Sequence, residues 1–229
     1  MPDYQYEKAA TLSGFKYICG VDEAGRGPLA GPVCAAAVIL PEGLEIEGVN
    51  DSKKLSEKKR EQLFDVIKEK AVSWCIAYGS LEEIEEFNIL EATFLAMNRA
   101  IEGLDIKADF ALIDGNRVPR GISIPCETVV KGDSHSMSIA AASILAKVAR
   151  DRLMMEYDEK YPQYNFKKHK GYGTKEHTNL IIEHGPSKIH RLSFLKNIVK
   201  LYGKIGFRKN RRGYGCRLCE RKGNACIPP

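Results

Sequence analysis

The chain has 229 residues, of which 44% are hydrophobic and 28% are charged, a composition that is typical of a soluble globular protein and excludes a disordered or fibrous chain. Its longest stretch without a charged residue, 27–41, has 15 residues, fewer than the roughly 20 that a membrane-spanning helix needs. The N-terminus lacks the basic start and apolar centre of a signal peptide, and the seven cysteines do not form a regular disulfide framework. These features predict a cytoplasmic protein.

The net charge of +5 is unevenly distributed along the chain. From Lys196 to the C-terminus there are ten Lys or Arg residues and one acid, Glu220, whereas residues 1–195 have 25 basic and 29 acidic residues. A mildly acidic body with a strongly basic end indicates a polyanionic partner such as a nucleic acid, although a basic end can also be merely solvated.

The hydrophobic pattern predicts strands that alternate with helices. The predicted strands are 17–22, 33–40, 73–78, 110–113 and 123–130. The predicted helices are one that begins after an N-cap at Ser56, one at 90–101 and the longest at 137–157, followed by shorter helical pieces. This order indicates an α/β domain with a mixed sheet. We expect an N-terminal leader at 1–15, a main domain at 16–202 and a flexible, basic, Cys-containing tail at 203–229.

Four acidic residues lie at the ends of the predicted elements. Asp22 and Glu23 follow the first strand, Asp114 ends another strand, and Asp133 precedes the longest helix. If the strands of Asp22 and Asp114 are neighbours, their carboxylates lie at the edge of the sheet where open α/β sheets bind ligands. Clustered carboxylates repel one another, and a hard divalent cation such as Mg²⁺ would offset that repulsion. The alternative is that each acid separately caps a turn or a helix.

A glycine-rich segment follows the first strand. Gly25–Ala30 matches the dinucleotide-binding pattern G-x-G-x-x-A. That pattern requires a helix next, but Gly31-Pro32 and a strand-like run follow, so a nicotinamide oxidoreductase is disfavoured. The glycines at 25 and 27 instead allow the backbone to approach a ligand closely, with a simple tight turn as the alternative.

Five segments together resemble bacterial ribonuclease HII, from about residue 16 to residue 195. They are GVDEAGRGPLAGPV at 20–33, NDSKKLSEKKRE at 50–61, DGN at 114–116, KGDSHSMSIAAASILAKVARDRLM at 131–154 and HKGYGTKEH at 169–177. The resemblance implies an RNase H-like fold, with a five-stranded mixed sheet flanked by helices and a helical C-terminal part. It also implies an endonuclease that hydrolyses the RNA strand of RNA–DNA hybrids and incises 5′ of ribonucleotides in duplex DNA, which initiates their removal. The products would carry 5′-phosphate and 3′-hydroxyl ends.

The resemblance assigns roles residue by residue. The catalytic and metal-binding acids would be Asp22, Glu23, Asp114 and Asp133, which would hold two Mg²⁺ or Mn²⁺ ions. The substrate-binding residues would be Gly25, Arg26 and Gly27, which sense the 2′-hydroxyl of the ribonucleotide, Ser52, Lys53 and Lys54, which contact the substrate, and Tyr172, which packs on the following deoxyribose. Gly173 departs from the family, which often has proline at this position.

The tail departs further from the family pattern. Cys216, Cys219 and Cys226 are similar to half of a zinc knuckle, but a closed structural zinc site takes four ligands. We therefore expect free thiols rather than zinc, and a tail that adds electrostatic affinity for the duplex. Two competing hypotheses are ribonuclease HIII, disfavoured because only about 15 residues precede the first strand, and a non-catalytic hybrid-binding module. We expect a monomer whose partners are RNA–DNA hybrids and ribonucleotide-containing DNA, with no membrane association.

Overall fold

The computed structural model describes residues 2–44, 46–49, 52, 55–196 and 198, and the backbone alone of 207–210 and 213–216. The chain forms two compact units. The first consists of Met1–Arg26 and Pro32–Arg152, and the second of Gly27–Gly31 and Leu153–Pro229. Residues 16–202, which the sequence assigns to one domain, therefore contribute to both units. None of the helices in the described ranges is long and apolar enough to cross a membrane.

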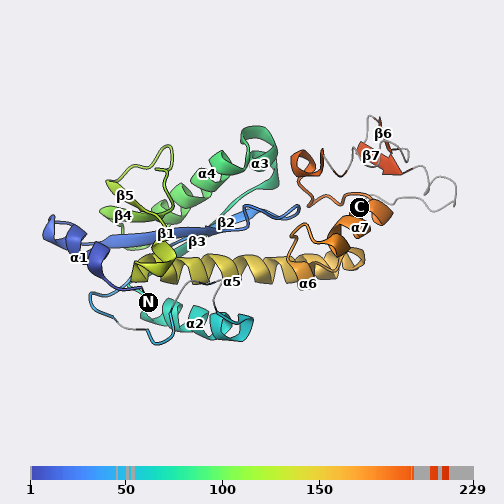
Figure 1. The fold of residues 1–229 in the computed structure, drawn as a ribbon. Helices are drawn as coiled ribbons and strands as arrows, with labels where there is room; N and C mark the ends of the chain where they lie inside the picture. The colour runs from blue at the N-terminus through green and yellow to red at the C-terminus, as the bar shows by residue number, and fades with distance from the viewer. Residues whose placement is uncertain are drawn as a thin grey trace. The chain divides into compact units, whose positions relative to one another are not determined.

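Five strands form one mixed sheet in the first unit (Figure 1). They are β1 (Ile18–Ala24), β2 (Val33–Ile39), β3 (Ser73–Gly79), β4 (Phe110–Asp114) and β5 (Cys126–Val129). Their order in the sheet is β3-β2-β1-β4-β5. The β1–β2 and β2–β3 pairs are antiparallel, whereas β4 runs parallel to both β1 and β5. The predicted α/β fold with a five-stranded mixed sheet is confirmed.

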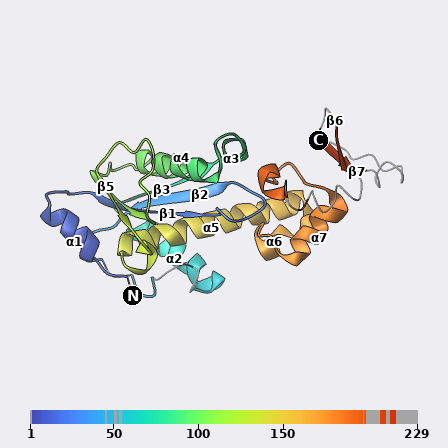
Figure 2. The same ribbon diagram turned by 45° about the horizontal axis from the view of Figure 1, so that its top comes forward.

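Helices cover both faces of this sheet. In chain order they are α1 (Gln5–Leu12), α2 (Glu57–Lys70), α3 (Leu81–Phe87), α4 (Ile89–Glu102) and α5 (Met137–Lys160), whose last turns belong to the second unit. Figures 1 and 2 show α4 on one face and α2 with α5 on the other. The predicted N-cap Ser56 is confirmed, since its hydroxyl accepts a hydrogen bond from the Lys59 backbone N–H at 3.2 Å.

The sequence did not predict α1 or α3. The leader at 1–15 contains α1, and α3 begins with a capping box in which Ser80 and Glu83 satisfy each other's backbone N–H groups. Both helices are short, so the apolar periodicity on which the prediction depends covers only about two turns of each.

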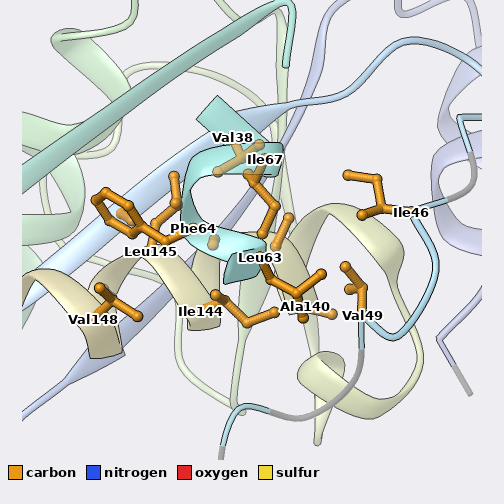
Figure 3. Packing of buried hydrophobic residues seen from close by; sticks show 14 of the residues in the cluster. Val38, Ile46, Val49, Leu63, Phe64, Ile67, Ala140, Ile144, Leu145 and Val148 are labelled. Atoms are coloured by element: carbon orange, nitrogen blue, oxygen red, sulfur yellow. The ribbon is translucent and has the colours of Figure 1, made fainter. Parts of the chain in front are cut away.

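The main core lies between β2, α2 and α5 (Figure 3). Leu63, Phe64 and Ile67 of α2 pack against Val38 of β2 and against the apolar side of α5. Small residues let α5 approach the sheet closely. A Cβ atom on Gly20 of β1 would lie only 2.1 Å from the carbonyl carbon of Ser138. The first turn of α5 therefore packs directly against β1, at a position two residues before Asp22.

The second unit is built from short helical pieces, in agreement with the helical C-terminal part that the sequence predicts. They are the 3₁₀-helix Pro162–Tyr164, α6 (Phe166–His169), α7 (Lys175–His184) and the 3₁₀-helix Leu192–Leu195. Farther along the chain, β6 (Phe207–Asn210) and β7 (Gly213–Cys216) pair antiparallel. The rest of the expected tail at 203–229 lies outside the described residues.

Candidate active site

The strands of Asp22 and Asp114 are neighbours in the sheet. Val21 of β1 pairs with Ile113 of β4 in parallel register, so the next residue on each strand, Asp22 and Asp114, lies at the same edge. The condition on which the predicted acidic site depends is therefore met. The predicted end of the first strand at Asp22 is wrong, because Asp22, Glu23 and Ala24 still pair with β2. Both acids lie within the strand, where pairing with a buried neighbour outweighs the low β-propensity of acidic residues.

Asp22 is the most constrained of the four acids. Its side chain is buried, and its Oδ1 accepts a hydrogen bond from the Glu23 backbone N–H at 2.6 Å. Burial, followed by the charges of Glu23 and Asp114, holds the pKa of the Asp22 carboxyl well above its usual range, and a hydrogen bond with Ser143 opposes this shift. The folded chain thus holds an ionised Asp22 at an energetic cost. A hard divalent cation would offset the repulsion between the buried Asp22 carboxylate and its half-buried neighbours Glu23 and Asp114.

Glu23 and Asp114 also line a small pocket of about 70 Å³ on the first unit. Arg26, whose side chain is 49% exposed, forms an ion pair with Glu23 at 3.4 Å (Nη1 to Oε1). Asn116 and Arg117, which follow the end of β4, complete its polar lining. The pocket therefore combines two of the predicted acids with basic side chains.

The turn that carries Asp133 is attached to Asp114. Asp133 lies in a 3₁₀-helix (Gly132–Ser134) between β5 and α5, and its side chain is buried. The backbone N–H of Gly132 donates to Asp114 Oδ1 at 2.7 Å, which attaches this turn to the end of β4. In the described part of the chain, however, no three His, Cys, Asp or Glu side chains converge closely enough to hold a metal ion.

The glycine-rich segment needs its first glycine for two reasons. Gly25 has a φ of +97°, and a Cβ atom there would lie 2.0 Å from Nε of Arg150. Arg150 is fully buried, and its Nε donates to the Pro32 carbonyl oxygen at 3.3 Å. Any side chain at position 25 would therefore displace a buried arginine that holds the other end of the segment.

Gly27 and Tyr172 lie next to each other in the second unit. A Cβ atom on Gly27 would be 3.8 Å from Cε1 of Tyr172, whose side chain is partly exposed. The Leu29 backbone N–H donates to the Gly171 carbonyl oxygen at 2.8 Å. Arg191, which is fully buried, donates from Nε to the Gly31 carbonyl oxygen at 2.8 Å. Two predicted substrate-binding residues far apart in the sequence are thus brought together.

Ser52, another predicted substrate-binding residue, is placed less favourably. Ser52 is 3% exposed, and its hydroxyl oxygen lies 2.8 Å from that of Ser143. Its hydroxyl therefore faces the interior, where Ser143 connects it to Asp22. Lys53 and Lys54 lie outside the described residues. So do Cys219 and Cys226, while Cys216 is described only as the last backbone position of β7.

Sequence reasoning assigned no site role to Ser143, Arg150 or Arg191. Ser143 and Arg150 lie on α5, and Arg191 lies close to the segment 27–31. The signal that could have found Ser143 is a hydroxyl within an otherwise apolar helix face. The arginines gave no such signal, because only the folded chain shows that they are buried.

The strand order, with helices on both faces of the mixed sheet, defines an RNase H-like fold. The structure of ribonuclease H2 from Pyrococcus horikoshii matches it with a TM-score of 0.69 and 26% identity, over 82% of this chain and 100% of that one. Ribonuclease HII of Clostridioides difficile is 57% identical over 194 residues, which cover 85% of this chain and 76% of the relative. Ribonuclease HII of Caldicellulosiruptor saccharolyticus is 53% identical over 197 residues, 86% of this chain and 96% of the relative.

The family model for ribonuclease HII matches residues 19–197. The chain belongs to the ribonuclease HII family and is a ribonuclease H of type 2. The enzyme class expected from the sequence is thereby confirmed.

Proposed function

We propose that the protein is a cytoplasmic endonuclease that requires Mg²⁺ or Mn²⁺. It hydrolyses the RNA strand of RNA–DNA hybrids, incises 5′ of ribonucleotides in duplex DNA and leaves 5′-phosphate and 3′-hydroxyl ends, which initiates ribonucleotide removal. The observation that carries the proposal is the parallel pairing of β1 and β4. This pairing places Asp22 beside Asp114, with Glu23 close enough to raise the pKa of Asp22.

The four acids would hold the cations once their side chains close on them, since no three of them already converge on one point in the described part of the chain. Asp22 contributes a buried carboxylate, Glu23 and Asp114 contribute carboxylates at the pocket, and Asp133 adds a fourth from the turn attached to Asp114. When bound, two divalent ions would supply an activated water and stabilise the leaving 3′-oxygen. Ser143 keeps Asp22 oriented, and burial of the carboxylate excludes water from its inner side.

The second unit would recognise the sugar. The absence of a side chain at Gly27 leaves its main chain accessible beside the Tyr172 ring. A main-chain contact to a 2′-hydroxyl and an aromatic contact to the next deoxyribose would then form one continuous surface. Lys53, Lys54 and the basic tail would contact backbone phosphates, which position the duplex without reading its sequence.

Cleavage of a continuous RNA–DNA hybrid tests the catalytic part of the proposal. The parent protein is expected to cut with Mg²⁺ or Mn²⁺ and to stop cutting when EDTA is added. Asp22→Asn, which keeps the side-chain shape and removes the charge, is expected to lose at least about a hundredfold in kcat. Asp65→Asn removes the same charge from an exposed position on α2 and serves as the control. Metal-independent cutting, or an Asp22→Asn variant as active as the control, would overturn the proposal.

A further inference from the structure

Three buried histidines lie together in the second unit. His169, His177 and His190 are 7%, 0% and 4% exposed. The rings of His169 and His177 are stacked with their centroids 4.2 Å apart, and Phe166 packs edge-on against His177 with a centroid distance of 5.5 Å. Since none of these rings faces solvent, their nitrogen atoms must find hydrogen-bond partners within the protein.

The backbone determines which nitrogen atoms carry protons. The Ser187 backbone N–H donates to His190 Nδ1 at 2.9 Å, so Nδ1 is an acceptor. A neutral imidazole has one donor and one acceptor, so His190 Nε2 carries the proton and donates to His177 Nε2 at 3.0 Å. His177 Nδ1 then carries a proton and donates to the Tyr172 carbonyl oxygen at 2.9 Å. The result is one directed chain of hydrogen bonds from Ser187 to Tyr172.

The third histidine follows the same logic. The Gly171 backbone N–H donates to His169 Nδ1 at 3.2 Å, so His169 Nε2 donates to the Tyr164 carbonyl oxygen at 2.7 Å. Burial lowers the pKa of all three histidines, in agreement with neutral rings. A second proton on any of these rings would turn its acceptor nitrogen into a donor and so disrupt the hydrogen bonds. The added charge would also favour neither of the neighbouring rings becoming charged.

This chain of hydrogen bonds ends on the main chain of Tyr172. The Tyr172 carbonyl oxygen also accepts from the Thr174 backbone N–H at 2.8 Å, and the Tyr172 N–H donates to the His169 carbonyl oxygen at 2.9 Å. Both polar groups of the Tyr172 main chain are therefore held, which limits how far its ring can turn.

The other end of the chain of hydrogen bonds is connected to the glycine-rich segment. His190 forms an isolated β-bridge with Ala30, and the Arg191 backbone N–H donates to the Leu29 carbonyl oxygen at 2.8 Å. Ala30 is three residues after Gly27. The histidine pair thus connects the segment that carries Gly27 to the segment that carries Tyr172.

We propose that His177 and His190 are positioning residues that set the Tyr172 ring against Gly27. In doing so they determine the preference for a ribonucleotide followed by deoxyribose over one followed by ribose. This inference rests on the proposed function of Tyr172 and Gly27 in sugar recognition. Neither histidine touches the substrate in this account, and each acts through the Tyr172 main chain.

Two substitutions at position 177 test the two hydrogen bonds of the His177 ring separately. In His177→Asn the side-chain amide nitrogen takes the place of Nδ1, which keeps donation to Tyr172 and loses the bond to His190. In His177→Gln the amide oxygen of the longer side chain takes the place of Nε2. This variant keeps the hydrogen bond from His190 and loses donation to Tyr172. Both remove the imidazole ring and its stacking on His169, so they are matched in lost packing.

The measured quantity is the ratio of kcat/KM for a duplex with one ribonucleotide to kcat/KM for a continuous RNA–DNA hybrid. We expect His177→Gln to lower this ratio by about tenfold or more and His177→Asn to change it by less than about threefold, because a small misplacement of a positioning group costs orders of magnitude in rate. Phe166→Leu perturbs the same packing without touching the hydrogen bonds and should leave the ratio unchanged. Thermal unfolding shows that each variant is folded at the assay temperature.

Tyr172→Ala distinguishes a failure of the inference from a failure of the proposed function. If Tyr172→Ala lowers the ratio while the two His177 variants behave alike, the positioning role of the histidines is overturned and the role of Tyr172 stands. If Tyr172→Ala leaves the ratio unchanged, the proposed sugar contact fails and the inference fails with it. If the parent protein cleaves neither substrate, the proposed nuclease function itself is overturned, and the inference falls too.

Discussion

The Glu7 carboxylate accepts a hydrogen bond from the backbone N–H of Ser138, 131 residues away in the sequence, at 3.0 Å. The same oxygen, Oε1, also accepts from the hydroxyls of Ser136 and Ser138 at 2.7 and 2.6 Å. Glu7 thus places a negative charge at the N-terminus of α5, where the helix dipole favours it. The turn that carries Asp133 immediately precedes this helix, so the N-terminal segment supports the turn of one of the four predicted acids.

Glu7→Ala is expected to lower the free energy of unfolding by about 1–3 kcal/mol, because three buried donors lose their acceptor. Glu7→Gln keeps an oxygen at this position and should cost less. Urea denaturation of both variants checks the expectation, with Lys8→Ala on the exposed side of α1 as the control. Equal stability of Glu7→Ala and the control would contradict the stabilising role of Glu7 at the N-terminus of α5.

Removal of the Asp22 charge is expected to stabilise the metal-free protein. The pKa of Asp22 is raised in the folded state by burial and by Glu23 and Asp114, so its ionised form opposes folding at neutral pH. Asp22→Asn should therefore raise the free energy of unfolding in EDTA by about 1–3 kcal/mol. The same variant should lose most of the stabilisation that added Mg²⁺ gives the parent protein, because ligand binding to the folded state stabilises it.

Thermal unfolding with EDTA and with Mg²⁺ measures both effects. A variant that is less stable than the parent protein in EDTA would contradict the repulsion inferred for this site. A variant that Mg²⁺ stabilises as much as it does the parent would show that Asp22 holds no cation.

The buried histidines predict a pH dependence of stability. The pKa of His177 is lowered to about 4, and that of His190 to about 3, by burial first and then by neighbouring rings. Below pH 6.5 the unfolded chain therefore binds protons that the folded chain does not. The free energy of unfolding should fall as the pH decreases from about 6.5 to 4, by up to about 1.4 kcal/mol per pH unit for each histidine.

His190→Gln removes one of these groups and should make the decrease shallower. Urea denaturation at several pH values between 7 and 4 provides the measurement. His184→Gln, at an exposed position near the end of α7, should keep the slope of the parent protein. If both variants share one slope, burial of neutral histidines does not cause the pH dependence.

Much of the sheet could be predicted because its strands are apolar runs bounded by Pro, Gly or Asp. The VCAAAVIL run of β2 and the FALI run of β4 are examples. The end of β1 could not be predicted, since Asp22 and Glu23 have low strand propensity and only pairing with β2 keeps them extended. Ser52 illustrates a different limit, because a hydroxyl in a charged segment gives no sign that it is buried against Ser143.

The candidate site was partly predictable for the same physical reasons. Apolar runs that are typical of strands lead up to Asp22 and Asp114, so the sequence could predict that both lie at the same edge of the sheet. The series of hydrogen bonds from Ser187 through His190 and His177 to Tyr172 could not be predicted. It depends on side-chain burial and on contacts between segments that have no shared periodicity.

Mapping the cut in an end-labelled duplex with a single ribonucleotide tests the central claim most directly. With Mg²⁺ or Mn²⁺, the parent protein is predicted to cut at one position, on the 5′ side of the ribonucleotide, and to leave a 3′-hydroxyl and a 5′-phosphate. Asp22→Asn and the all-DNA duplex should give no product. Cleavage on the 3′ side, cleavage of the all-DNA duplex, or a cut that persists in Asp22→Asn would contradict the account.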